Sequence, residues 1–153
     1  MGDVSSQGDR SAGVGRPGHG HRSAPAGTGR VIEAWGPDAA ACLTEALVAL
    51  VEGFCEIGDA PAARVLPLSV AQGPEDALTS LIEEVLDAMG AFSVVPVRFH
   101  LTATEDGGFA GDMEVVPVGA VSLVRRPPTA VSFDGLSMAG DERGWRCRVR
   151  VDA

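Results

Sequence analysis

Two stretches of the chain carry apolar residues at three- and four-residue steps, the spacing that places them on one face of a helix. The first stretch follows Gly36-Pro37 and ends near Cys55, and Asp38 is a suitable N-cap for it. The second opens at Pro74 and has Gly90 as a natural C′ residue. The apolar positions are Leu43, Ala46, Leu47, Leu50, Val51 and Phe54 in the first stretch, and Leu78, Leu81, Ile82, Val85, Leu86 and Met89 in the second. The pattern therefore predicts two amphipathic helices.

The other ordered segments have the residue types and the alternation of β-strands. The last of them alternates strictly, with apolar positions at Trp145, Cys147, Val149 and Val151 and polar positions at Arg146, Arg148, Arg150 and Asp152. A one-residue slip would bury three arginines, so we expect this register to be well fixed. Further strands are expected at Val31–Trp35, Val65–Val70, Phe92–Val97, Arg98–Thr104, Phe109–Val118 and Thr129–Phe133, with a hairpin turn at residues 105–108.

Two helices among about seven strands, with local hairpins, predict an α+β fold. We expect a two-layer sandwich in which a largely antiparallel sheet packs against the two helices. Because Trp35 and Trp145 both occupy apolar strand positions, we expect their side chains to share one core.

Residues 1 to about 24 are rich in glycine, serine and arginine and show no apolar periodicity. They are predicted to form a disordered tail, and residues 25–153 to form one domain. His19 and His21 fall in this tail, with no carboxylate or thiol close in sequence. We therefore interpret them as solvated residues rather than as metal ligands.

Composition excludes several classes of function. All twelve basic residues are arginine, so lysine-based Schiff bases, P-loop lysines and nucleotidyl-lysine intermediates are ruled out. A formal net charge of −9 disfavours direct binding to the phosphate backbone of nucleic acids. No apolar run approaches the ~20 residues of a membrane span, and the N-terminus lacks the apolar segment of a secretory signal. Three cysteines without CxxC spacing indicate reduced thiols, so we expect a cytoplasmic protein.

No spacing in the sequence is typical of an active site. Glu83-Glu84 fit an exposed helical face, and His100 lies in mid-strand. Ser132 and Cys147 have no histidine at a recognisable distance along the chain. The arginine row of the last strand can be read as an electropositive patch or as a solvated face crossed by acidic neighbours. The residues therefore assign no catalytic group, and we do not expect an enzyme.

Several segments, in the same order, resemble the archease family. HRSAPAGTGRVIEAWG and CLTEALVALVEGF are similar to its first strand and helix, and DALTSLIEEVLDAM is similar to its second helix. TAVSFDGL and GWRCRVRVDA are similar to its two closing strands, so the likeness covers roughly residues 20–153. The resemblance implies an accessory protein that assists an RtcB-type RNA-splicing ligase in tRNA splicing and RNA repair. Family members promote guanylylation and turnover of that ligase and carry out no bond chemistry themselves.

The likeness also shows what this chain lacks. The family carries His-Thr-Ala-Asp before its first strand, where the Asp serves metal binding and ligase activation; here those positions are residues 26–29, and the Asp is Gly29. The lysine and the histidine of the closing segment are Thr129 and Asp134. The resemblance implies a Ca²⁺-type divalent cation site of which Asp152 is the one retained ligand, and whether Asp134 substitutes for a lost ligand stays open.

Two functions remain open at this point. The first is an archease-like accessory protein that docks on an RtcB-type ligase through the outer face of the closing strand and the loop at residues 27–29. The second is a metal-free binding or structural module that has kept the fold and serves another protein partner. For both, we expect binding of divalent cations to be weak.

Overall fold

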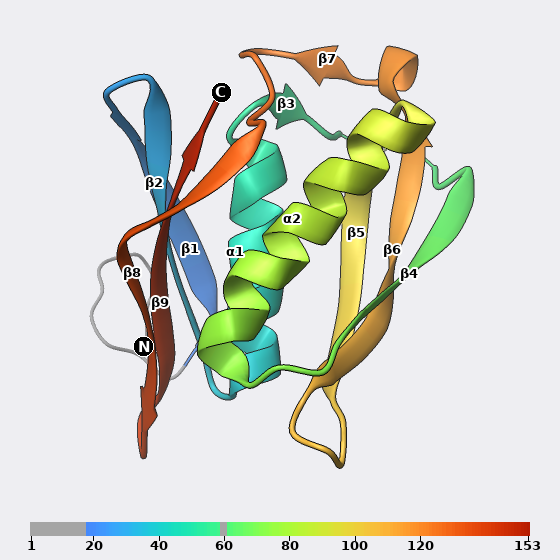
Figure 1. The fold of residues 1–153 in the computed structure, drawn as a ribbon. Helices are drawn as coiled ribbons and strands as arrows, with labels where there is room; N and C mark the ends of the chain where they lie inside the picture. The colour runs from blue at the N-terminus through green and yellow to red at the C-terminus, as the bar shows by residue number, and fades with distance from the viewer. Residues whose placement is uncertain (1–17, 59–60) are drawn as a thin grey trace, which may run out of the picture.

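A computed structural model describes residues 18–58 and 61–153, and within them two α-helices lie between two antiparallel sheets (Figure 1). The larger sheet has the strand order β1-β2-β9-β8, the second has the order β4-β6-β5, and a short pair joins β3 to β7. The strands are β1 Gly20–Ala26, β2 Gly29–Gly36, β3 Cys55–Glu56, β4 Arg64–Val70, β5 Val94–Ala103, β6 Phe109–Pro117, β7 Ser122–Leu123, β8 Ala130–Asp141 and β9 Gly144–Asp152. The helices are α1 Ala39–Glu52 and α2 Pro74–Phe92.

The α+β class, with two helices and antiparallel sheets, is confirmed. What the pattern left out is the division of the strands between two sheets. Helix α1 packs on β2 on one side and on β5 on the other, and α2 packs between β8 and β4. The helical layer is therefore covered on both faces, which explains why α1 is so strongly apolar. Neither of these helices is long and apolar enough to cross a membrane.

Helix α1 begins as the sequence predicts. The Asp38 carboxylate accepts a hydrogen bond from the Ala41 N–H at 2.8 Å, which satisfies one of the free donors of the first turn. Half of its residues are buried, among them Leu43, Leu47 and Leu50. These leucines form the centre of the core, with contacts to both sheets.

Helix α2 ends later than predicted. Gly90 lies within the helix, and the left-handed position that ends it is occupied by Ser93, with φ 53° and ψ 47°. The extra turn brings Phe92 under the Arg64 guanidinium, 5.0 Å from the ring centroid. A glycine two residues before the end of a helix looks the same in sequence as one that ends it.

The tail boundary expected near residue 24 is also wrong. Residues 20–26 form β1, an edge strand paired along its whole length with β2. Its side chains show no apolar alternation because backbone pairing and polar contacts to α1, rather than core burial, hold it in place. Residues 1–17 lie outside the described residues.

The two tryptophans do not share a core. Trp35 pairs with Arg146, while Trp145 pairs with Gly36, so the two rings lie on opposite faces of the larger sheet. Trp145 packs on the core and covers Gly140, whereas Trp35 covers Gly20 of β1. Both tryptophans are half-buried. In the closing strand the predicted register is confirmed, because Cys147, Val149 and Val151 are buried in the core.

The end of α2 can be tested with Gly90→Ala. A Cβ at Gly90 would meet no atom within 4 Å, so the change should stabilise the helix interior by about 0.5–1 kcal/mol. Urea unfolding would measure the gain, with Ser93→Gly as a second variant that should also stabilise, because it relieves a left-handed serine. If Gly90 instead ended the helix in a left-handed conformation, the alanine variant would lose stability.

Candidate functional site

The start of β2 and the end of β9 bring together positions that the sequence singled out. Gly29 pairs with Asp152 across β2 and β9, and Ala130 pairs with Asp152 across β8 and β9. The Thr129 N–H donates to the Asp152 carbonyl oxygen at 2.8 Å. Asp152 therefore lies between the loop before β2 and the start of β8, the arrangement that the resemblance implies.

The Asp152 carboxylate is paired with a guanidinium. Arg150 Nη2 lies 3.0 Å from Asp152 Oδ1, and Arg150 Nε lies 3.2 Å from the same oxygen. The two side chains are 30% and 32% exposed, so the pair is only partly screened by water. The cationic partner of this carboxylate is thus supplied by the chain itself.

Position 29 is closely covered. A Cβ built on Gly29 would overlap the Val151 carbonyl oxygen and the Asp152 carboxylate. Any side chain at this position, an aspartate included, therefore requires the start of β2 or the end of β9 to move. The missing carboxylate of the family pattern cannot be added here by a single substitution without a backbone shift.

The structure does not bring Asp134 to Asp152. Asp134 is exposed and lies in an irregular part of β8, between Ser132 and Ser137, where the pairing with β9 changes register. Its N–H donates to the Ser132 hydroxyl at 3.1 Å, and Gly135 at φ 73° provides the bend. Since Ser132 pairs with Arg150, Asp134 lies further along the strand, away from the residue that pairs with Asp152.

The donors at this end of the sheet do not match a calcium site. Ca²⁺ takes about six to eight oxygen ligands, usually including several carboxylates. Here one carboxylate is already paired with a guanidinium, and glycine and threonine occupy the other two positions. Across the described parts of the chain, no group of three or more His, Cys, Asp or Glu side chains is arranged to hold a metal ion.

The arginine row of β9 is crossed by acidic neighbours. Glu33 of β2 pairs with Arg148 and accepts a hydrogen bond from Arg22 Nε at 2.6 Å. Arg150 is paired with Asp152, and Arg148 donates to the Gly135 carbonyl oxygen at 3.4 Å. Of the two interpretations, the solvated face with mixed charges is the one that the contacts favour.

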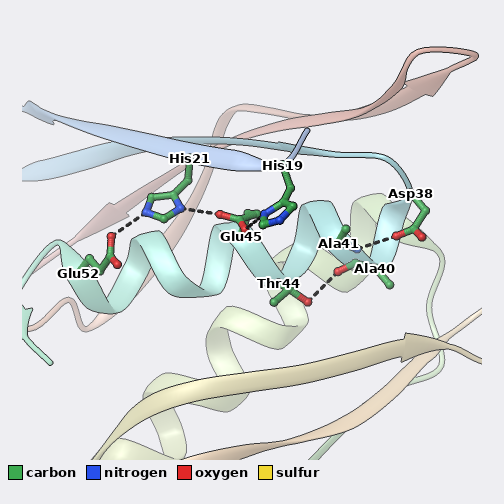
Figure 2. A network of polar contacts seen from close by, with 8 residues as sticks. All are labelled: His19, His21, Asp38, Ala40, Ala41, Thr44, Glu45 and Glu52. Carbon is green, nitrogen blue, oxygen red and sulfur yellow. Dashed lines mark hydrogen bonds and ion pairs between the residues drawn. The ribbon is translucent and has the colours of Figure 1, made fainter. Parts of the chain in front are cut away.

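Sequence analysis missed a histidine–glutamate cluster that joins β1 to α1 (Figure 2). His21 Nδ1 lies 2.7 Å from Glu45 Oε1, and His21 Nε2 lies 2.7 Å from Glu52 Oε1. His19 Nδ1 lies 2.5 Å from Glu45 Oε2. The interpretation of these histidines as solvated tail residues is therefore wrong. Two signals could have found the cluster: the histidines alternate on one strand face, and the glutamates are seven residues apart on one helix face.

The cluster shifts the protonation of its members. The hydrogen bond to Glu45 raises the pKa of His21 above its ordinary value, against the opposing effect of burial, and Glu52 adds to the rise. Burial opposes ionisation of Glu45, but the hydrogen bonds from His21 and His19 outweigh it and lower its pKa. A protonated His21 between two carboxylates therefore fastens the edge strand β1 to the central helix.

The other candidate residues from the sequence, His100 and Cys147, lie far from each other in the fold. His100 is exposed on β5 and lies 2.6 Å from Glu114 of β6, on the other sheet. Cys42 and Cys147 are both buried, and the interaction with the Cys147 thiol, followed by burial, raises the pKa of Cys42. Among the described residues, neither His100 nor Cys147 contacts a partner with which it could form a nucleophile–base pair.

Comparison with known proteins identifies the family of this chain. The model of the archease protein family (MTH1598/TM1083) matches residues 30–153. Two curated relatives from Mycobacterium tuberculosis, strains CDC 1551 / Oshkosh and ATCC 25618 / H37Rv, are each named "Probable protein archease". Each is 32% identical over 142 residues, which cover 91% of this chain and 79% of the relative.

A solved structure shows the same architecture. The solution structure of Methanobacterium thermoautotrophicum protein 1598 matches with a TM-score of 0.70 at 16% identity, covering 90% of this chain and 100% of that one. The fold and the family match thus define a small α+β protein of the archease type. The chain belongs to the archease family.

The His21 contacts predict a pH-dependent stability. Because the pKa of His21 is raised, its contribution is complete below the unfolded value near 6.5 and is lost as the pH rises through the folded value. Because the pKa of Glu45 is lowered, its contribution is present above about 4.5 and is lost as the pH falls through the folded value. His21→Gln should therefore cost about 1 kcal/mol near pH 5.5 and much less near pH 8.5.

Urea unfolding of both proteins at the two pH values measures this difference. His100→Gln is the control, because its ring is 59% exposed on the other sheet and should change the pH dependence far less. An equal loss at both pH values would contradict the proposed charge on His21.

The close covering of Gly29 predicts a second stability effect. Gly29→Ala should destabilise the protein by about 1–3 kcal/mol, because the added methyl group must displace the Val151 carbonyl or Asp152. Gly119→Ala is the matched control, since a Cβ there meets nothing within 4 Å. Equal midpoints in chemical denaturation for both variants would contradict this prediction, because they would show that the end of β9 moves aside without loss of stability.

Proposed function

We propose that this chain is an accessory protein of an RtcB-type RNA ligase, and that it binds the ligase rather than catalysing a reaction itself. The observation that carries the proposal is membership of the archease family over residues 30–153. The cytoplasm, where we expected the protein from its cysteines, is the compartment in which such a partner would be met.

We propose that the chain acts by docking, without the metal assistance that the family resemblance implies. Gly29 offers no carboxylate, Thr129 offers no amine, and Asp152 is paired with Arg150. Support for weak cation binding comes from this donor set, which leaves a divalent ion to compete with a guanidinium for one carboxylate.

The docking surface that we propose is the outer face of β9 with the neighbouring loop at residues 27–29. Arg146 and Arg148 are exposed there, and Phe133, in the irregular part of the neighbouring strand β8, is 66% exposed. Arginines form bidentate contacts with carboxylates, and an exposed aromatic ring supplies apolar contact area. The surface thus suits an acidic region of a protein partner with an apolar spot.

A ligase-binding and guanylylation assay tests the proposal. With the RtcB-type ligase of the same genome, the chain should bind but should stimulate guanylylation and turnover only weakly. The double variant Arg146→Glu, Arg148→Glu should weaken binding about tenfold or more, because it reverses two charges on the proposed surface. Arg98→Glu, on β5 of the other sheet, is the control and should leave binding unchanged.

Two results would contradict this function. Full multiple-turnover activation by the unmodified chain would show that the missing aspartate is dispensable and that docking alone is too narrow a description. Absence of any binding to the ligase would favour the alternative, a metal-free module with another protein partner.

A further inference from the structure

A pocket of about 250 Å³ opens on the inner side of the larger sheet, between the start of β2 and the end of α1. Its floor includes the apolar side chains of Ile32, Leu50 and Phe54, and its walls include Arg30, Arg125 and Arg126. The pocket is distinct from the Arg150–Asp152 pair. Arg30 has the strand parity of the buried Ile32 and Ala34, whereas Gly29 and its partner Asp152 have the opposite parity.

The charge of this pocket is predominantly positive. No aspartate or glutamate contributes to its lining, and the carboxylate of the terminal Ala153 is the one acidic group in it. None of its three arginines forms an ion pair within residues 18–58 and 61–153. Three guanidinium groups and one carboxylate around one cavity leave a net positive charge, which produces a positive potential inside it.

Two of the arginines are held in place by neutral acceptors. Arg30 Nη2 donates to the Ser23 hydroxyl at 3.2 Å, and Arg125 Nη1 donates to the Gly53 carbonyl oxygen at 2.9 Å. A guanidinium carries five N–H donors, so each of these contacts orients the group and leaves further donors for a ligand. Ser23 and Thr28 add hydroxyl groups to the same lining.

We propose that this pocket binds a small phosphate monoester whose other end is apolar. A phosphate monoester carries up to two negative charges at neutral pH and three strong acceptor oxygens, which match several arginines better than a single carboxylate does. The apolar floor fits a ring or short hydrocarbon group attached to the phosphate. The volume lies slightly below the ~300–1,000 Å³ of drug-sized ligand sites, which limits the ligand to a compact molecule. The proposal does not depend on the ligase partner.

Binding of phenyl phosphate tests the proposal, followed by NMR of the labelled full chain at constant ionic strength and pH 7.5. We expect saturable shifts centred on the amides of Gly29, Gly53 and Arg125, with inorganic phosphate binding more weakly because it lacks the apolar group. Benzoate carries the same ring with one negative charge, and we expect it to bind about tenfold more weakly than phenyl phosphate.

Arg126→Gln is the decisive variant. Arg126 is exposed and its side chain forms no hydrogen bond or ion pair with another described residue, so the change should not disturb the fold. It should weaken phenyl phosphate binding about tenfold, and Arg126→Lys should recover part of the loss. Arg143→Gln is the matched control, since it removes the same charge from the exposed turn between β8 and β9.

Four results would overturn the proposal. They are the absence of saturable shifts at tens of millimolar phenyl phosphate, unchanged binding by Arg126→Gln, an equal loss with Arg143→Gln, and benzoate binding as tightly as phenyl phosphate. The third result would show a general charge effect rather than a site, and the fourth would show that no phosphate group is recognised.

Discussion

The burial of α1 between two sheets is the constraint on which the rest of this structure depends. Leu43, Leu47 and Leu50 are almost completely excluded from water, and each contributes on the order of 1.5–3 kcal/mol by leaving it. Because both sheets close on this one helix, the ends of their strands are fixed relative to its ends. The polar groups at the end of β9 and around the pocket therefore stand on rigid elements rather than on independent loops.

The same helix explains the histidine–glutamate cluster. An edge strand without a buried side chain gains little from the core, so β1 needs other contacts to remain on the sheet. Glu45 and Glu52 lie on the side of α1 that faces β1, where His21 reaches both carboxylates. The cluster thus attaches β1 to the buried helix α1, although β1 itself has no buried side chain.

The sequence predicted those features that one element determines by itself. The register of β9 followed from strict alternation, and the start of α1 followed from Asp38. The errors came where the outcome depends on an element far away in the chain. Gly90 continues α2 because Phe92 finds a contact with Arg64, and the tail boundary failed because β1 pairs with β2. In the candidate site, Asp152 could be identified by family resemblance, but its pairing with Arg150 and the positive pocket could not, because both require side chains to be placed in space.

The arginines on the two faces of the larger sheet have different surroundings. On the outer face, Arg150 neutralises Asp152 and the row is balanced by Glu33. On the inner face, Arg30, Arg125 and Arg126 line a cavity to which no aspartate or glutamate contributes. A divalent cation at this strand end would therefore have to displace one guanidinium and would also meet the positive field of the three arginines that line the pocket. The glycine at position 29 and the arginines nearby act in the same electrostatic direction, because one removes a possible negative charge and the others add positive charge at this end of the fold.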